Sequence, residues 1–207
     1  MAAINLVLAA AAIALPEPID MSSWLSAADY PKHSEVVAER GYVIYQLTVS
    51  PEGRVVRCDT LQRSTIGLSV CNALEARATF KPATDKAGQP IFAIYENMKA
   101  FRLEGLNMPP RPLKAGSILT LDRMPAGVSD PFDVKLALLV DAAGKVIDCR
   151  PVEDSSNGND AASVLNRLAC AETVVDPRQS AQDSQGKSVV SVQSITVRFQ
   201  TKAVASD

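Results

Sequence analysis

The sequence has 207 residues and a formal net charge of −2, because 21 Lys and Arg residues nearly balance 23 Asp and Glu residues. Apolar residues make up 47% of the chain and charged residues 21%, which excludes a disordered tail and a broadly basic nucleic-acid surface. The single histidine, His33, argues against mechanisms that need a histidine base or several histidine ligands. The length accommodates one large domain or two small ones.

An uncharged apolar run, Ile4 to Leu15, lies at the start of the chain. As a helix it would span about 18 Å, which is short of the ~30 Å hydrocarbon core of a membrane. The run has the length of the apolar region of a secretory signal, and Ala12-Ile13-Ala14 provides an A-x-A cleavage motif, although no basic residue precedes it. We therefore predict that residues 1–15 form a signal peptide. A short membrane anchor and a buried core helix are the alternatives.

The first half of the remaining chain has the pattern of a small antiparallel sheet with one helix. Apolar residues alternate from Val43 to Val49, which predicts a half-buried strand, and Pro51-Glu52-Gly53 predicts a turn after it. We expect, in chain order, a short helix over Ser34–Arg40, strands over Val43–Val49 and Arg54–Leu61, a helix over Leu68–Thr79 and a long strand over Pro90–Leu103.

The second half repeats this order. Residues 43–67 align without a gap on residues 134–158, and the identities include the turn glycines Gly53 and Gly144. Two unrelated hairpins are the alternative interpretation. The repeat predicts strands over Phe132–Asp141 and Val146–Val152, a helix over Ala161–Glu172 and a strand over Ser188–Thr201. The proline-rich connection between the halves has room for a short strand at Ile118, Leu119 and Leu121.

The four cysteines occupy matching places, with one on the second strand and one on the helix of each half. The economical pairing joins Cys58 to Cys71 and Cys149 to Cys170, and loops of this size stabilise a fold by about 3 kcal/mol each. Such bridges indicate an oxidising compartment. Buried free thiols are the alternative, and a zinc site is disfavoured because the chain has no close C-x-x-C pair.

An ordered series of motifs resembles the C-terminal domain of TonB-type proteins. The series is Asp29-Tyr30-Pro31, the hairpin closed at Gly53, Ser64-x-x-Gly67 before a helix, Phe80-Lys81-Pro82-Ala83, and Gly88-Gln89-Pro90 before the last strand. The cysteines make it similar to a subgroup in which a disulfide ties strand to helix. The second half resembles the domain less well, and only Val174-Val175-Asp176-Pro177 lies near the place of the Phe-x-Pro-Ala segment.

Together, the repeat and the resemblance imply an α+β fold. We expect two tandem ββαβ-type units, each a helix packed on a small antiparallel sheet, over residues 27–104 and 131–203, with residues 105–130 connecting them. The apolar alternation should bury Val43, Tyr45, Leu47 and Val49 in the first unit and Val134, Leu136, Leu138 and Val140 in the second.

The resemblance also implies a mode of binding. In the family the domain lies in the periplasm and binds a short peptide of an outer-membrane transporter, which adds as a strand beside the third strand. An unpaired strand edge suits this, because its N–H and C=O groups are free to bond. The alternative is that the third strand is an ordinary, covered strand of the sheet. The partner-binding residues that the resemblance carries over are Asp29, Tyr30, Pro31, Ile91, Ala93, Tyr95, Asn97 and Lys99, and Glu96 adds polar selection beside them.

The resemblance therefore implies a periplasmic protein, with an inner-membrane anchor as the alternative location. Its expected partner is an outer-membrane transporter peptide or another envelope protein, with a homodimer through edge strands as the alternative. A full energy transducer also has a long periplasmic spacer, whereas the dozen or so residues before Tyr30 reach only about 43 Å when fully extended. A structural or self-associating envelope protein is the second interpretation.

Positive signs of catalysis are lacking in the sequence. Ser64 and Ser155-Ser156 do not lie in a G-x-S-x-G setting, and no glycine-rich phosphate loop is present. His33 is expected to be a solvated helix-start residue, and Glu153-Asp154 a solvated turn. We predict a binding protein that is not an enzyme and has no cofactor, no metal and no nucleic-acid partner. An enzyme is the rival hypothesis.

Overall fold

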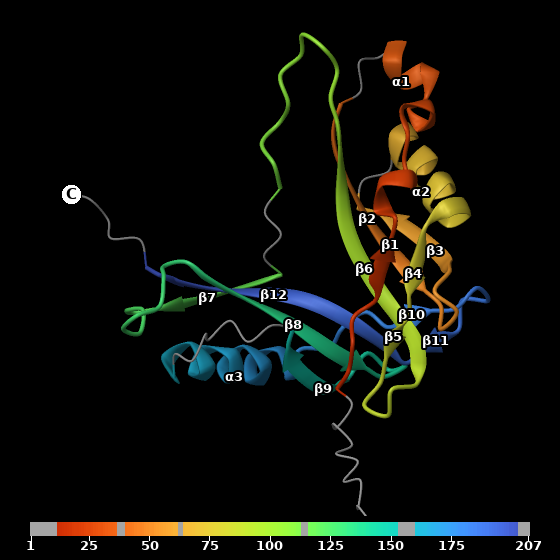
Figure 1. Cartoon of the computed structure of the whole chain (residues 1–207). Coiled ribbons are helices and arrows are strands. Elements are labelled where there is room, and N and C mark those ends of the chain that lie inside the picture. The colour runs from red at the N-terminus through yellow and green to blue at the C-terminus, as the bar shows by residue number, and fades with distance from the viewer. Residues whose placement is uncertain (1–11, 37–39, 62–63, 113–115, 153–159, 203–207) are drawn as a thin grey trace, which may run out of the picture.

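The computed structural model describes residues 12–36, 40–61, 64–112, 116–152 and 160–202, which are arranged as Figure 1 shows. Strands dominate the fold, with 41% strand and 21% helix. Most of the strands belong to one eight-stranded mixed sheet. Two further pairs of short strands lie beside this sheet.

The first half of the sheet consists of the hairpin β2 (Gly41–Val49) and β3 (Val55–Thr60), with the long strand β6 (Pro90–Phe101) on the other side of β2. The alternation predicted for β2 is confirmed, because Tyr45, Leu47 and Val49 are buried and Val43 is partly buried against the same core. The other elements of this half are α1 (Lys32–Val36), α2 (Thr65–Arg77), β4 (Thr79–Lys81) and β5 (Ala83–Thr84), which pairs with the start of β6.

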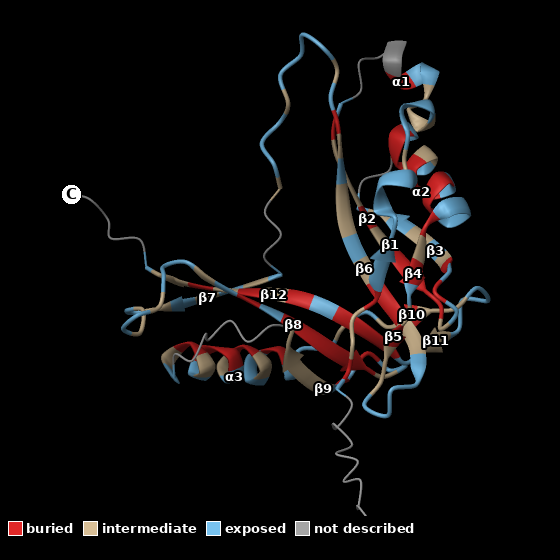
Figure 2. Cartoon of the chain, in the orientation of Figure 1, coloured by how far each residue is buried: buried red, intermediate tan, exposed pale blue. Residues whose placement is uncertain are grey.

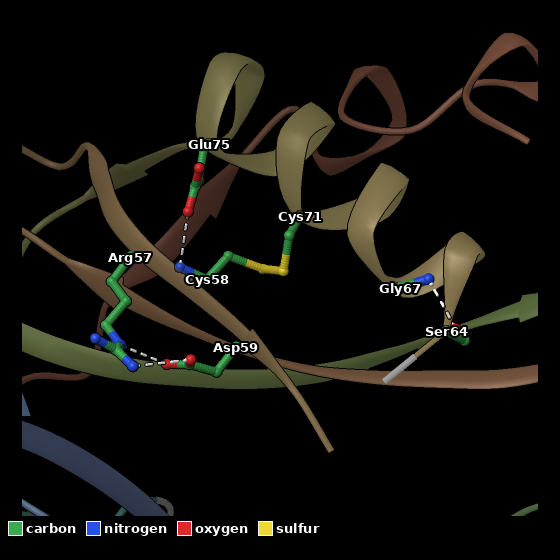
Figure 3. The surroundings of a disulfide bond; sticks show 7 residues. All are labelled: Arg57, Cys58, Asp59, Ser64, Gly67, Cys71 and Glu75. Atoms are coloured by element: carbon green, nitrogen blue, oxygen red, sulfur yellow. Dashed lines mark hydrogen bonds and ion pairs between the residues drawn. A yellow bond between two sulfur atoms is a disulfide. The ribbon is translucent and has the colours of Figure 1, made fainter. Parts of the chain in front are cut away.

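Helix α2 begins earlier than the spacing of apolar residues predicted. Ser64 caps it, since the Ser64 hydroxyl accepts a hydrogen bond from the Gly67 N–H at 2.9 Å (Figure 3). Ile66, Val70 and Leu74 of the helix are buried against the sheet. The cap therefore sets the start of the helix, and its apolar face sets its position on the sheet.

The second half repeats the order of the first. Strands β8 (Phe132–Val140) and β9 (Val146–Pro151) form a hairpin, and β12 (Ser191–Thr201) runs antiparallel to β8. Val134, Leu136, Leu138 and Val140 are buried, as predicted. The remaining elements are β7 (Ser117–Leu121), α3 (Asp160–Val174), β10 (Ala181–Gln182) and β11 (Ser188–Val189), of which β7 adds in parallel to the end of β12.

The prediction of two separate ββαβ units in an α+β fold is wrong, because the two halves share one sheet. Strands β6 and β12 are parallel neighbours, with Phe92 opposite Ser191 and Ala93 opposite Val192. The main path of the sheet therefore runs β3-β2-β6-β12-β8-β9. A third strand with an open edge carries unpaired backbone groups, and here the third strands of the two halves pair with each other. The result is a mainly β protein with a mixed sheet.

The helices α2 and α3 cover opposite faces of this sheet. The pairing of β6, β12 and β8 places Ala93, Val192 and Leu139 on one face, and these residues belong to the core that α2 covers. Leu136 and Leu138 point to the other face and pack with α3. The end of β8 is consequently buried on both faces, as its colour in Figure 2 shows.

Residues 13–24, which we name the N-terminal strap, join the two halves. Its strand β1 (Glu17–Ile19) pairs with β4, and Ala14 exchanges backbone hydrogen bonds of 2.9 and 3.2 Å with Thr84. Ile13 is fully buried in the same core as Leu139, and its carbonyl accepts a hydrogen bond from Arg150 Nε. Residues 1–11 of the predicted signal peptide lie outside the described residues, whereas residues 13–15 pack within the fold.

Both predicted disulfides are present. Cys58 on β3 is bonded to Cys71 on α2, with Cα atoms 5.4 Å apart (Figure 3), and Cys149 on β9 is bonded to Cys170 on α3, with Cα atoms 5.7 Å apart. Neither bridge crosses between the halves. Each one fixes an outer strand of the sheet to the helix that covers it.

Candidate partner-binding fork

Strands β6 and β12 separate beyond Ala93 and Val192, and Figure 1 shows them spreading apart from their shared end. We name the cavity at this point the fork. It has a volume of about 870 Å³. Its lining includes residues 94–97 of β6, residues 193–196 of β12 and residues 14–18 of the strap. It also includes Lys135, Arg150 and Val152 of the β8–β9 hairpin region, and Arg178 and Gln179 after α3.

The backbone groups that β6 presents to the fork follow from the pairing of β2. The Leu61 N–H donates to the Ile44 carbonyl, so the even-numbered residues of β2 bond to β3 and the odd-numbered ones to β6. On β6 the residues whose backbone N–H and C=O groups point away from β2 toward the fork therefore include Glu96, Met98 and Ala100. No strand among the described residues pairs with them on that side. The Met98 N–H is occupied by the Asn97 side-chain oxygen at 2.9 Å, which agrees with its outward direction.

The opposite wall of the fork is β12. The Val152 N–H donates to the Lys135 carbonyl, so even-numbered residues of β8 bond to β12, and Ser194 and Thr196 of β12 point into the fork. The Thr196 carbonyl accepts a bond from the Gly116 N–H at 2.9 Å, and directly after Gly116 the strand β7 begins. The edge of β12 thus already carries an added strand at residues 197–201, whereas the same edge of β6 has none among the described residues.

The outer edges of the sheet are closed by local devices. On β3 the outward N–H of Cys58 donates to the Glu75 carboxylate at 3.0 Å, and the disulfide holds α2 beside it (Figure 3). On β9 the outward positions include Cys149, which is tied to α3, and Pro151, which has no N–H to offer. A partner strand therefore meets fewer obstacles at the fork than at either outer edge.

The structure separates the predicted partner-binding residues into two groups. Tyr95 and Asn97 line the fork, and Lys99 is exposed farther along β6. Ile91 and Ala93 lie before the fork opens, where they pair with Ala83 and Val192. The fork thus starts at Ile94, three residues later than the edge that the resemblance implies.

Asp29, Tyr30 and Pro31 do not line the fork. The Asp29 carboxylate accepts a hydrogen bond from the Ser26 N–H at 2.7 Å and forms an ion pair with Arg77 of α2 at 2.6 Å. These contacts, the Ser26 bond first, hold the pKa of Asp29 below its ordinary value. Tyr30 stacks on Phe101 at the far end of β6, with ring centroids 5.8 Å apart. In this structure the segment holds α2 and β6 together.

The strap covers Tyr95 on the same face of the sheet that α2 covers. Trp24 is only 1% exposed and packs edge-on against Tyr95, with ring centroids 6.3 Å apart. The ring centroid of Phe80 lies 4.9 Å from that of Trp24 and 5.0 Å from that of Tyr95. The Tyr95 hydroxyl and the Asn97 side-chain nitrogen each donate to the Met21 sulfur at 3.6 Å. Burial raises the pKa of the Tyr95 phenol, so this side chain stays neutral and acts as a donor.

Sequence analysis missed three groups of the fork. It did not identify which alternate residues of β6 expose their backbone, because the pattern of one strand does not show which neighbour lies on which side. It did not assign Ser194 to the same cavity. It also missed the basic residues Lys135, Arg150 and Arg178, which lie far from β6 in the sequence and for which no local motif is present.

Among the described residues, no cluster of three or more His, Cys, Asp and Glu side chains is placed to hold a metal ion. His33 is exposed on α1, and Ser64 caps α2. Glu153, Asp154, Ser155 and Ser156 lie outside the described residues.

Comparisons with known proteins find no match for this chain among protein-family models, curated proteins or solved structures. In the part of the chain that the structure describes, no helix has the length and apolar character needed to cross a membrane.

Proposed function

We propose that this chain is a periplasmic envelope protein that binds an extended segment of a partner by strand addition to β6 in the fork. The observation that carries the proposal is the open edge of β6, where the backbone groups of Glu96 and Ala100 and the carbonyl of Met98 point away from β2. An extended peptide satisfies such groups with main-chain hydrogen bonds.

The chain contains its own example of this kind of binding. Strand β7 lies along β12 in parallel, with Val197 opposite Ser117 and Thr201 opposite Leu121. A shift of 98 positions aligns Phe101 with Phe199 in the repeat, so the matching seat on the first half begins at residues 99–101 of β6, directly after the part that lines the fork. A partner segment in that seat would extend the sheet as β7 extends it on the second half.

The class of partner follows from the compartment. Two disulfides support an oxidising location, and the motif series that resembles TonB-type domains favours the periplasm and an outer-membrane transporter peptide or another envelope protein. A second copy of the chain, added through the same edge, is the alternative partner. We propose binding without catalysis.

The test uses synthetic peptides copied from the periplasmic N-terminal segments of the outer-membrane transporters of the producing bacterium. Binding is followed by the fluorescence of Trp24, the single tryptophan, which contacts Tyr95. Glu96→Pro removes the outward N–H of Glu96 and leaves the bonds to β2 in place, so peptide affinity should fall by about tenfold.

Ile147→Pro is the control, because it places a proline at an exposed position of the outer strand β9 that does not line the fork. Its affinity should equal that of the wild type. Equal affinity of Glu96→Pro and the wild type would refute strand addition at β6. Sedimentation of the protein alone detects the alternative partner, since a dimer that Glu96→Pro dissociates would be self-association through this edge.

A further inference from the structure

Three cationic side chains line the fork from the side opposite β6. Lys135 comes from β8, Arg150 from β9, and Arg178 from the segment after α3. Two carboxylates, Glu17 and Glu96, line the same cavity. Glu17 is already paired with Lys81 at 3.3 Å. The fork therefore has an excess of positive charge, which favours an anionic group on whatever enters it.

Arg178 is held in place by its backbone. Its N–H donates to the Gly144 carbonyl at 2.7 Å, and the approach is so close that a Cβ at Gly144 would stand 2.3 Å from the Arg178 carbonyl oxygen. The next residue, Gln179, accepts a hydrogen bond from the Gln193 side chain of β12 at 2.8 Å. These contacts place Arg178 near the closed end of the fork.

The guanidinium of Arg178 has an unused donor. Its Nε is buried and makes no hydrogen bond to any described residue. A buried N–H without a partner costs free energy that a bound acceptor would recover. Arg150, by contrast, uses its Nε to bind the Ile13 carbonyl, so Arg150 is fixed by the strap and adds charge at the same site.

We propose that Arg178, Lys135 and Arg150 form an anion subsite in the fork that binds the carboxylate of an Asp or Glu residue carried by the added strand. The inference rests on the proposed function, since strand addition to β6 brings the carboxylate into the fork. A singly charged carboxylate suits the cavity better than a phosphate dianion because Glu96 lines the same wall as the incoming strand. A guanidinium donor pairs well with a carboxylate.

The experiment compares two capped peptides of alternating valine and threonine that carry glutamate at both ends or glutamine at both ends. Placing the charge at both ends makes the test independent of strand direction. Binding of each labelled peptide is measured by fluorescence polarisation at low and at high salt. The glutamate peptide should bind the wild type about tenfold more tightly at low salt, and the difference should shrink at high salt.

The variants Arg178→Gln and Lys135→Gln should remove most of this preference and leave the affinity of the glutamine peptide unchanged. Arg167→Gln on α3 is the charge-matched control, because Arg167 is exposed and does not line the fork, and it should keep the preference. Inorganic phosphate should compete with the glutamate peptide only at concentrations far above that of the peptide.

The outcomes separate this inference from the proposed function. Equal affinity of the two peptides for the wild type would overturn the anion subsite and leave strand addition standing. If Glu96→Pro binds the glutamate peptide with wild-type affinity and keeps the preference for glutamate, the result would support an anion site and overturn strand addition. If neither peptide binds, both proposals are wrong. If phosphate displaces the glutamate peptide as effectively as the unlabelled peptide does, the subsite is not selective for a carboxylate, and the inference is overturned.

Discussion

The two disulfides allow a quantitative prediction about how the outer strands are held. Replacing both cysteines of a bridge avoids a free thiol, so the variants are Cys58→Ser/Cys71→Ser and Cys149→Ser/Cys170→Ser. The bridges join residues 13 and 21 positions apart. On the chain-entropy model, loops of these lengths contribute about 3 kcal/mol each. A loss of that size corresponds to a fall in Tm of roughly 6–12 °C for a domain of this length.

The assay is thermal unfolding followed by far-UV circular dichroism, with and without a strong thiol reductant. In oxidising buffer each variant should melt below the wild type by the amount above, and the two losses should be similar in size. In reductant the wild type and the two variants should approach the same Tm, because all of them then lack both bridges. Mass spectrometry after alkylation confirms which thiols are free in each sample.

The comparison between the variants tests the reasoning directly. The two bridges are separate in space, because each lies within one half, so their losses should add. A wild type that keeps its Tm after full reduction would show that the bridges do not stabilise the fold. Each variant is its own internal control. Because it keeps one bridge, its Tm should fall in reductant only by the loss expected for that bridge.

Three further predictions concern single residues. Ile13→Ala should lower the free energy of unfolding by about 2–4 kcal/mol in denaturant titrations, whereas Ile19→Ala, at a side chain 51% exposed in the same strap, should change it little. Gly53→Ala and Gly144→Ala should each cost about 1–3 kcal/mol, because both residues have positive φ and an added Cβ would meet the Phe80 or Arg178 carbonyl oxygen at 2.0 or 2.3 Å; equal stability of either variant and the wild type would contradict this. Asp29 has a lowered pKa, so its contribution is complete above the unfolded value of 3.8 and is lost as pH falls through the folded value; Asp29→Asn should be less stable than the wild type at neutral pH, and urea titrations at decreasing pH should show the gap closing.

Local patterns predicted the hairpins, helices and bridges well. Period-two alternation identified β2 and β8 with their buried faces, and the repeated positions of Cys58 and Cys149 identified the disulfides. These features depend on residues close in the sequence or on internal comparison. The capping role of Ser64 was also present in the sequence as Ser64-x-x-Gly67, although the helix was expected to start at Leu68.

The junction between the halves could not be predicted in the same way. The pairing of Phe92 with Ser191 leaves no periodic mark in either strand. One signal was present in β8, where Leu136 to Val140 is an unbroken apolar run, as expected for a strand covered on both faces. The strap was missed because the apolar residues around Ile13 suit a secretory signal as well as a core. The junction and the strap together form the fork, so the cationic residues that line it were missed as well.

The parallel pairing of β6 and β12 has a consequence for the order of folding. Each hairpin closes a short loop, and each disulfide links residues within one half, so these parts form from local contacts. The β6–β12 pairing joins residues about a hundred positions apart, which makes it entropically costly to reach early. We expect the halves to acquire structure first and to dock late. Until then the edges of both third strands are exposed, so the interval before docking is when a newly made chain is most prone to aggregate.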